Sequence, residues 1–389
     1  MKRFFSYSIL SFFLLLLPTG QASANNNDSI RLSLLTCAPG EEIYSLFGHT
    51  AIRYENSSQG IDVVFNYGLF SFNTPNFIFR FSLGETDYQL GATDYERFAA
   101  EYAFFGRSVW QQTLNLTDEE KTELIRLLQE NYRPENRVYR YNFFYDNCAT
   151  RPRDKIEESI AGKVIYPAEP QDGSLTFRDI VHQYCKGHPW ARFGIDLCIG
   201  SEADQPITQR QMMFAPFYLM DAFDGAQIKG DSIQRPLITA NELIVDATPE
   251  PDESDWMPTP LQCSLLLFIL TAAATIYGIR RRTGLWGIDL FLFGIAGIVG
   301  CVLAFLALFS QHPAVSSNFL LLVFHPGQLL FLPYIIYCVR KGKKCWYLTL
   351  NLAVLTLFIV LFPVIPQRFD FAVVPLALVL LIRSASNLF

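Results

Sequence analysis

Hydrophobic and polar positions divide the chain into three parts, and the first part is short. Residues 1–24 begin with two basic residues, continue with an apolar run over 4–17, and end in the small-residue site Ala22-Ser23-Ala24. That order is typical of a secretory signal peptide, and the apolar run is short for a membrane-spanning helix. We expect cleavage after Ala24, with an uncleaved N-terminal anchor as the alternative. In either case the residues that follow are exported.

The second part, residues 25–247, has the mixed pattern of a globular domain. Alternation predicts strands, and capping signals predict helices. The expected strands are 30–36, 50–54, 62–67, 109–116 and 138–144, and the expected helices are 94–105, 117–132 and 177–184. A turn-rich link joins the strands at 50–54 and 62–67 into a hairpin. Helices inserted between such strands indicate an α+β domain with an antiparallel sheet.

Within residues 73–84, Phe77, Phe79 and Phe81 alternate with non-aromatic residues. A period of two predicts a strand with a row of phenylalanines on one face. One interpretation is a strand that packs on the core. The other is a wall for an acyl chain at the membrane surface.

The third part, residues 261–389, is almost entirely apolar and predicts an all-α transmembrane bundle. Five segments have about the length of a bilayer-spanning helix: 261–279, 285–309, 319–339, 346–365 and 369–386. Residues 248–260, rich in proline and acid, read as a stiff linker. Basic clusters follow the first and third spans, at 280–282 and 340–344, so the positive-inside rule places the domain before them outside the cytoplasm.

Composition and cysteine usage agree with an exported domain joined to a membrane part. The chain is 50% hydrophobic with a net charge of -6, which suits neither an ordinary soluble domain nor a pure membrane bundle. We expect a multi-pass protein of the bacterial inner membrane with its N-terminal domain in the periplasm, and no nucleic-acid partner. No C-x-x-C or clustered spacing suggests zinc, and no cofactor is expected. Cys185 and Cys198 could pair in an oxidising compartment, which would leave Cys148 free.

Cys148 is the candidate nucleophile. It follows Asp146-Asn147, two good helix N-cap residues, so we expect it in the first turn of a helix with Arg151 close by. A helix dipole and a neighbouring cation both lower the pKa of a thiol, which predicts an available thiolate. His49, at the start of the predicted hairpin, is the expected proton-transfer partner. Residues near Asn66 on the second hairpin strand must lie beside His49.

Four motifs resemble the Lnb-type lipoprotein N-acyltransferases, which have an exported N-terminal domain and a C-terminal membrane part. They are Gly48-His49-Thr50-Ala51-Ile52-Arg53, Asn66-Tyr67-Gly68, Asn147-Cys148-Ala149-Thr150-Arg151 and Phe193-Gly194-Ile195-Asp196. More distantly, a histidine strand before a cysteine helix is similar to the circularly permuted papain-like enzymes, which include lecithin-retinol-type acyltransferases and permuted NlpC-type peptidases. In those folds a third polar group orients the imidazole, and Asn66 and Asp62 are both candidates.

The resemblance implies a reaction and its partners. A phospholipid would donate an acyl chain to Cys148 as a thioester, and the terminal amine of a diacylated lipoprotein would accept it. The oxyanion would be stabilised by the Cys148 amide, with Asn147 or Arg151 as alternatives. Asp154 is a candidate supporting residue, although Arg151 and Asp154 also fit a solvated helix face. Candidates for contact with substrate or lipid are Tyr67, His325 and Asn318, and His312 lies near the same membrane surface.

Two other functions fit parts of the pattern. A membrane-tethered cysteine peptidase or amidase that acts on cell-wall peptide would use the same Cys148 and His49, although five spans exceed what tethering needs. A noncatalytic sensor or scaffold would pair Cys148 with Cys37 or another thiol.

Overall fold

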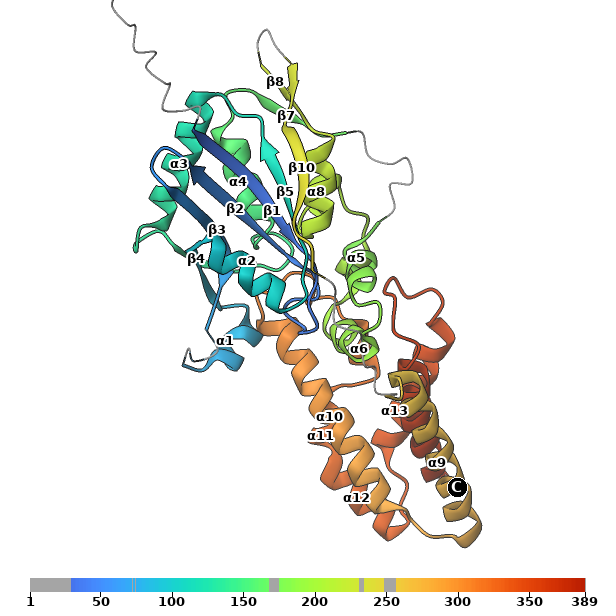
Figure 1. The fold of residues 1–389 in the computed structure, drawn as a ribbon. Helices are drawn as coiled ribbons and strands as arrows, with labels where there is room; N and C mark the ends of the chain where they lie inside the picture. Colours follow the sequence, from blue (N-terminus) through green and yellow to red (C-terminus); the bar gives the residue numbers. More distant parts are fainter. Residues whose placement is uncertain are drawn as a thin grey trace, which may run out of the picture.

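The computed structural model describes residues 29–71, 73, 75–167, 175–230, 234–247 and 257–388. The expected signal peptide lies outside the described residues, as does most of the expected linker. Figure 1 shows a sheet-containing domain at one end of the molecule and a bundle of helices at the other.

A seven-stranded antiparallel sheet forms the centre of the exported domain. In spatial order its strands are β10 (Ile238–Val245), β5 (Val109–Leu114), β1 (Ile30–Cys37), β2 (His49–Asn56), β3 (Ile61–Leu69), β4 (Asp87–Asp94) and β6 (Val138–Arg140). A small second sheet contains β7 (Lys163–Ile165), β8 (Gln227–Lys229) and β9 (Gln234–Pro236). The predicted hairpin is the β2–β3 pair, and the α+β class is confirmed.

Helices cover both faces of the large sheet. On one face, α3 (Asp118–Tyr132), α4 (Thr150–Ser159) and α8 (Pro216–Asp224) pack on a core that includes Leu34, Ile52 and Phe65. On the other face, α2 (Tyr95–Phe104) packs Phe98 against Val64 and its neighbours. Helices were expected at both 94–105 and 117–132, and the second begins with the predicted capping box between Thr117 and Glu120.

The aromatic segment at 73–84 is a helix, and the predicted strand is wrong. Helix α1 (Phe77–Leu83) lies between β3 and β4 in sequence but outside the sheet, beside the outer end of α10 (Figure 1). Phe77 and Phe81, four residues apart, stack at 6.0 Å, while Phe79 contacts Phe305 of α10. In a segment this short, alternating phenylalanines are compatible both with a strand and with a helix that packs its phenylalanine rings on a neighbouring helix.

The predicted strand at 138–144 is also shorter than expected. Strand β6 ends at Arg140, and Asn142 then pairs with Asp146 across a tight turn. The Asn142 carboxamide oxygen accepts hydrogen bonds from the amides of Phe144 and Tyr145 at 3.3 and 3.1 Å. An asparagine that satisfies backbone donors in this way favours a turn over a continued strand.

The membrane part contains two helices long and apolar enough to cross a bilayer, α9 (Pro260–Arg281) and α10 (Trp286–Phe309). The third expected span is broken. It comprises η2 (Phe319–Leu322), α11 (Pro326–Leu330) and α12 (Leu332–Lys341), with a bend of 74°. The fourth and fifth are shorter apolar helices, α13 (Trp346–Leu361) and α14 (Val373–Ala385), the latter continued by η3 (Ser386–Leu388).

Two glycines of α10 allow the broken segment to lie against it. A Cβ on Gly300 would come within 2.4 Å of the His325 amide nitrogen, and one on Gly297 within 2.5 Å of the Leu329 amide. Any side chain at either position would collide with backbone. The close approach therefore depends on glycine at both sites.

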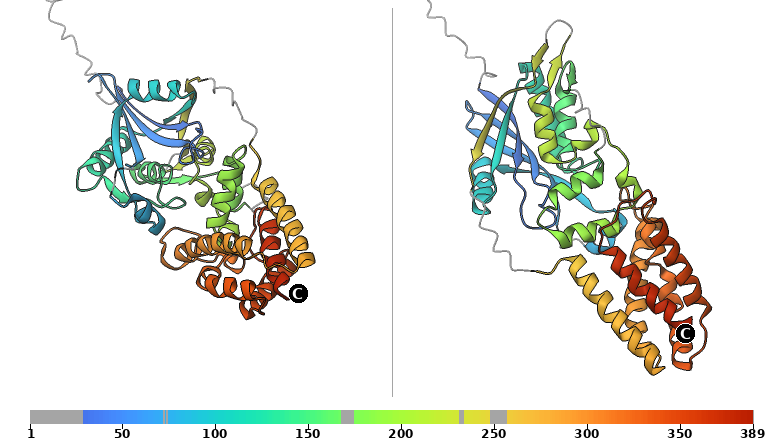
Figure 2. Two further views of the ribbon diagram at one scale, coloured as in Figure 1. Left: turned by 90° about the horizontal axis from the view of Figure 1, so that it is seen from below. Right: turned by 90° about the vertical axis from the view of Figure 1, so that its right-hand side faces the viewer.

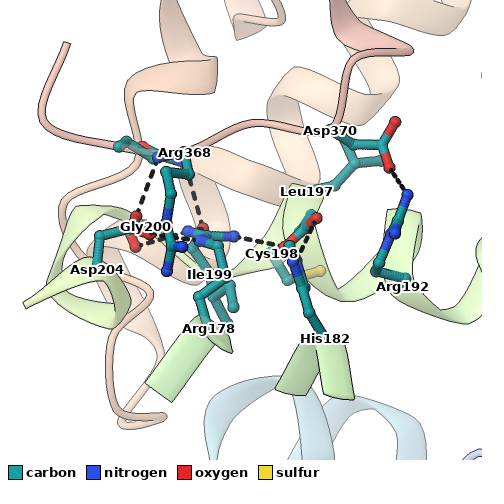
Figure 3. A network of polar contacts seen from close by, with 12 residues as sticks. Arg178, His182, Arg192, Leu197, Cys198, Ile199, Gly200, Asp204, Arg368 and Asp370 are labelled. Carbon is teal, nitrogen blue, oxygen red and sulfur yellow. Dashed lines mark hydrogen bonds and ion pairs between the residues drawn. The ribbon is translucent and has the colours of Figure 1, made fainter. Parts of the chain in front are cut away.

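The remaining helices of the exported domain lie between the sheet and the bundle (Figure 2). They are α5 (Phe177–Tyr184), α6 (Pro189–Cys198), η1 (Ser201–Asp204) and α7 (Gln209–Met212). Arg178 of α5 is fully buried and bonds to Asp196 at 2.6 Å and Asp204 at 2.9 Å. Arg368, from the loop before α14, bonds to the same Asp204 at 2.9 Å. Figure 3 shows this polar network, which joins the exported domain to the membrane part.

Further contacts strengthen the same junction. Arg192 pairs with Asp370 at 3.2 Å, and the Asn318 carboxamide donates to the Leu197 carbonyl at 2.7 Å. A backbone hydrogen bond of 2.7 Å joins Gly200 to Ala314. Because these bonds come from several loops at one end of the bundle, they fix the orientation of the sheet-containing domain on the bundle.

We predict that Arg178→Leu destabilises the full chain by about 3–5 kcal/mol, because it removes the fully buried cation shared by Asp196 and Asp204 and leaves them only His182 and Arg368. The measurement is the thermal unfolding midpoint in detergent. Arg126→Leu is the control, since Arg126 pairs with Glu123 and Glu130 on the exposed face of α3 and such pairs contribute little. Equal effects of the two substitutions would contradict the prediction.

Candidate active site

His49 is the first residue of β2, and the turn before it requires glycine. Gly48 has φ +78°, and a Cβ there would lie 2.5 Å from the Cys37 carbonyl oxygen. The His49 Nε2 atom lies 3.2 Å from Asn66 Oδ1. An oxygen acceptor at that position requires the proton on Nε2, which leaves Nδ1 as the basic nitrogen of the neutral ring.

Cys148 lies in the turn immediately before α4, one residue before the N-cap Ala149. The sequence predicts it in the first turn of the helix, and this prediction is wrong. Asn147 holds this turn in place. Its Oδ1 accepts from the amides of Ala149 and Thr150 at 2.8 and 2.9 Å, and its Nδ2 donates to the carbonyls of Phe143 and Phe214 at 2.8 Å each. With every polar atom of its buried side chain bonded, Asn147 positions its neighbour.

The turn brings Cys148 to the start of β2. The backbone of Thr50, the residue after His49, lies close enough to the Cys148 thiol to favour its thiolate. On the other side, Gly68 of β3 has φ +91°, and a Cβ there would lie 3.4 Å from the Cys148 Cβ. The cysteine therefore sits at the end of the sheet where β2 begins and β3 ends, the region that also holds His49 and Asn66.

Burial raises the pKa of the Cys148 thiol to about 11, although the Thr50 amide and its own amide favour the thiolate. The expectation of a lowered pKa is wrong, for two physical reasons. The first amides of α4 bond to Asn147, so they do not face the sulfur. Arg151 is neutralised by Asp146, with bonds of 2.6 and 2.8 Å.

Burial also lowers the pKa of His49 to about 4, while the hydrogen bond to Asn66 opposes the shift and the charge of Arg107 adds to it. At neutral pH both the Cys148 thiol and the His49 imidazole are therefore uncharged. A thiol and an imidazole in those states would have to react by general-base catalysis, in which the proton leaves sulfur as the new bond forms.

The structure gives several other predicted site residues different partners. Asp62 pairs with Arg53 at 2.9 and 2.7 Å, so of the two candidates for orienting His49 only Asn66 contacts it. Asp154 faces the protein surface and pairs with Arg210 at 2.7 Å. The Tyr67 ring is fully buried in the core, and its hydroxyl donates to Asn131 at 2.8 Å.

The predicted lipid-contacting residues of the membrane part also have internal partners. His325 Nε2 lies 3.2 Å from Asn351 Oδ1 within the bundle. Asn318 is buried and bonds to α6, so it belongs to the junction between the domains. His312 lies 2.6 Å from the carbonyl oxygen of Phe81 and holds α1.

Sequence reasoning missed some contributors to the site and its surroundings. The Thr50 amide carries no sequence signal, because any residue supplies it. Tyr88 and Tyr141 stack at 4.1 Å close to Cys148, yet in the sequence they are two of many tyrosines. Arg178 and Arg368 had a usable signal, since each is a charge beside apolar helices that needs a buried carboxylate nearby.

All eight cysteines carry free thiols. The proposed pairing of Cys185 with Cys198 is therefore absent from this structure. Cys148 is free, as a nucleophile must be.

Comparison with protein families gives two matches, and both agree with the resemblance noted in the sequence. Residues 20–182 match the family described as the Lnb N-terminal periplasmic domain. Residues 252–389 match the Lnb transmembrane domain. Searches of curated proteins and of solved structures each found no match.

We predict that alkylation of Cys148 by iodoacetamide is slow at neutral pH and rises about tenfold per pH unit, because the thiolate fraction grows in that proportion below the pKa. The rise should continue toward pH 11, the value to which burial raises the pKa. Peptide-level mass spectrometry measures the rate at Cys148, and Cys148→Ser identifies the signal. A rate that already levels off near neutral pH would show a preformed thiolate and contradict the prediction.

Proposed function

Because this chain belongs to the Lnb family, we propose that it is a lipoprotein N-acyltransferase that uses Cys148 as nucleophile and His49 as acid and base. The observation that supports this most strongly is a free, half-buried thiol beside the backbone of Thr50, the residue that follows the neutral His49. The domain that carries it is fixed to the outer end of an apolar helical bundle. A nucleophile in that place meets lipid substrates without leaving the membrane surface.

In the first step, a phospholipid ester is the acyl donor. His49 Nδ1 takes the thiol proton as Cys148 Sγ bonds to the ester carbonyl carbon. The carbon–oxygen bond of the ester then breaks, and the protonated imidazole gives its proton to the departing alkoxide. The products are a thioester on Cys148 and a lysophospholipid.

In the second step, the terminal amine of a diacylated lipoprotein attacks the thioester carbonyl. A carbon–nitrogen bond forms, the carbon–sulfur bond breaks, and His49 carries one amine proton to the departing sulfur. The enzyme returns to its neutral state with an amide on the lipoprotein. Because burial lowers the pKa of His49, the imidazole is neutral at physiological pH and its Nδ1 lone pair can accept the proton.

The Cys148 amide is the proposed oxyanion donor in both steps. The Asn147 side chain accepts from the amides of Ala149 and Thr150, so the Cys148 amide is left to face the sulfur and its acyl group. The alternatives from the sequence are weaker, since the Asn147 side-chain amide serves two carbonyls and Arg151 serves Asp146.

The proposal includes the setting of the reaction. The protein would lie in the bacterial inner membrane, with the five apolar segments of 261–389 in the bilayer and the Cys148 domain in the periplasm. Its partners would be a phospholipid donor and a diacylated lipoprotein. The chain order, with the histidine strand before the cysteine turn, suits a permuted papain-like enzyme, and this is the order in which β2 and Cys148 occur here.

We predict that the purified full chain in phosphatidylethanolamine vesicles acquires the mass of one acyl group on Cys148, and that hydroxylamine removes it because thioesters are labile to that nucleophile. Intact mass spectrometry measures the adduct. Cys148→Ala should show none. Release of fragments from cell-wall muropeptides, with no acyl adduct, would instead support a cysteine peptidase or amidase.

We predict that Asn66→Ala slows formation of the adduct about 100-fold with little change in half-saturating lipid, because the imidazole loses its tautomer and orientation. Asp62→Asn is the matched control on the same strand, since Asp62 bonds to Arg53 and not to His49. Single-turnover mass spectrometry over a range of lipid concentrations gives both quantities. If Asp62→Asn were as slow as Asn66→Ala, the assigned role of Asn66 would be wrong.

A further inference from the structure

An apolar groove of about 950 Å³ lies between α1 of the exported domain and α10 of the membrane part. Its lining from α1 includes Phe77, Ile78 and Phe79, and its lining from α10 includes Val302 and Phe305. Phe79 and Phe305 contact each other across it, but Ile78 and Val302 stay exposed, so the remaining apolar surface needs another explanation.

The medium beside this groove is the bilayer. One wall is α10, a helix long and apolar enough to span a membrane. The other wall is α1, in which no residue is buried and Ile78 is 81% exposed and Phe79 59% exposed. Apolar side chains so exposed are stable against hydrocarbon and costly in water. The groove therefore faces acyl chains.

Helix α1 is held firmly at this place. The Leu83 carbonyl accepts a hydrogen bond of 2.8 Å from the Gln311 amide, and His312 lies 2.6 Å from the Phe81 carbonyl oxygen. A Cβ on Gly84 would come within 2.9 Å of the His312 amide nitrogen, so the two segments touch. The groove is thus a fixed feature and not a gap between independent bodies.

A series of aromatic rings leads from the groove to the candidate nucleophile. Phe77 stacks on Phe70 at 5.9 Å, Phe70 contacts Tyr88 at 4.9 Å, and Tyr88 stacks on Tyr141 at 4.1 Å. Tyr88 precedes Gln89, which pairs with Leu69 of β3, and the neighbouring Gly68 is the residue against which the Cys148 Cβ lies. The series therefore starts at the groove and ends at the part of the sheet that holds Cys148.

We propose that the groove between α1 and α10 holds the acyl chain that is transferred, as part of a bilayer glycerophospholipid, and that Phe77, Phe70 and Tyr88 guide its ester toward Cys148. The inference rests on the proposed acyltransferase function and adds the donor site. The depth of the groove along α10 then sets which chain lengths are accepted, because a chain that overfills it cannot bring its ester to the sulfur.

The test uses the full chain in nanodiscs that contain equal amounts of dilauroyl and dipalmitoyl phosphatidylethanolamine. Val302→Trp fills the groove, and the control Leu308→Trp adds the same ring to α10 at a residue that is 74% exposed and outside the groove lining. Intact mass spectrometry reads which acyl group appears on Cys148. Monodisperse size-exclusion profiles and unchanged unfolding midpoints establish that both variants are folded.

Val302→Trp should lower the ratio of palmitoyl to lauroyl adduct about tenfold or more, because a few methylenes in an apolar pocket discriminate by at least that factor. Leu308→Trp should leave the ratio unchanged. Equal ratios in the two variants and the unsubstituted chain would overturn the assignment of the groove, while an acyl adduct on Cys148 would still support the proposed function.

Absence of an acyl adduct on the unsubstituted chain would refute the proposed function. A second measurement tests whether the groove binds lipid, whether or not an adduct forms. A phosphatidylethanolamine with a diazirine in its acyl chain is photolysed in the same nanodiscs, and labelled peptides are identified. Labelling of α1 and of α10 near Val302, reduced in Val302→Trp and retained in Leu308→Trp, supports a lipid site. Labelling spread evenly over the exposed faces of α9 and α10 overturns it.

Discussion

The site depends on the packing of one turn against the end of the central sheet. Cys148 lies between the backbone of Thr50 in β2 and Gly68 in β3, so the two strands define where the sulfur lies. Antiparallel pairing sets Ala51 opposite Asn66 and thereby brings Asn66 beside His49. Asn147 stabilises the turn itself, because its side chain hydrogen-bonds to backbone amides and carbonyls that have no partner in a regular helix or strand there. Rigid strands therefore position the imidazole and its partner, and a side-chain-stabilised turn positions the thiol.

Burial at this place explains why both reacting groups are neutral. The same exclusion of water that raises the pKa of Cys148 lowers that of His49. A preformed ion pair would be costly beside the buried tyrosines Tyr88 and Tyr141. The arrangement suits a reaction in which the proton moves only when an ester is present. It also suits a lipid substrate, since the surroundings that disfavour charge favour an acyl chain.

Much of the exported domain could be predicted from local patterns. Alternation located β2 and β3, the Thr117 capping box located α3, and the change of composition near Leu261 located the bundle. The errors arose where long-range packing decides the outcome. Phe77 to Leu83 form a helix because α10 provides a wall beside them, and the Cys148 pKa rises because strands distant in sequence bury it. The choice between Asn66 and Asp62 needed strand register and the position of Arg53, neither of which the sequence specifies.

A chase experiment can follow the proposed passage of one acyl chain through Cys148. The full chain, first loaded with a labelled acyl group, is separated from free lipid and mixed with a synthetic diacylated lipopeptide, and both species are followed by mass spectrometry. The label is expected to leave Cys148 and to appear as an amide on the lipopeptide at the same rate. Label that stays on the enzyme while the lipopeptide remains unacylated, or that leaves only as free fatty acid, would contradict this expectation.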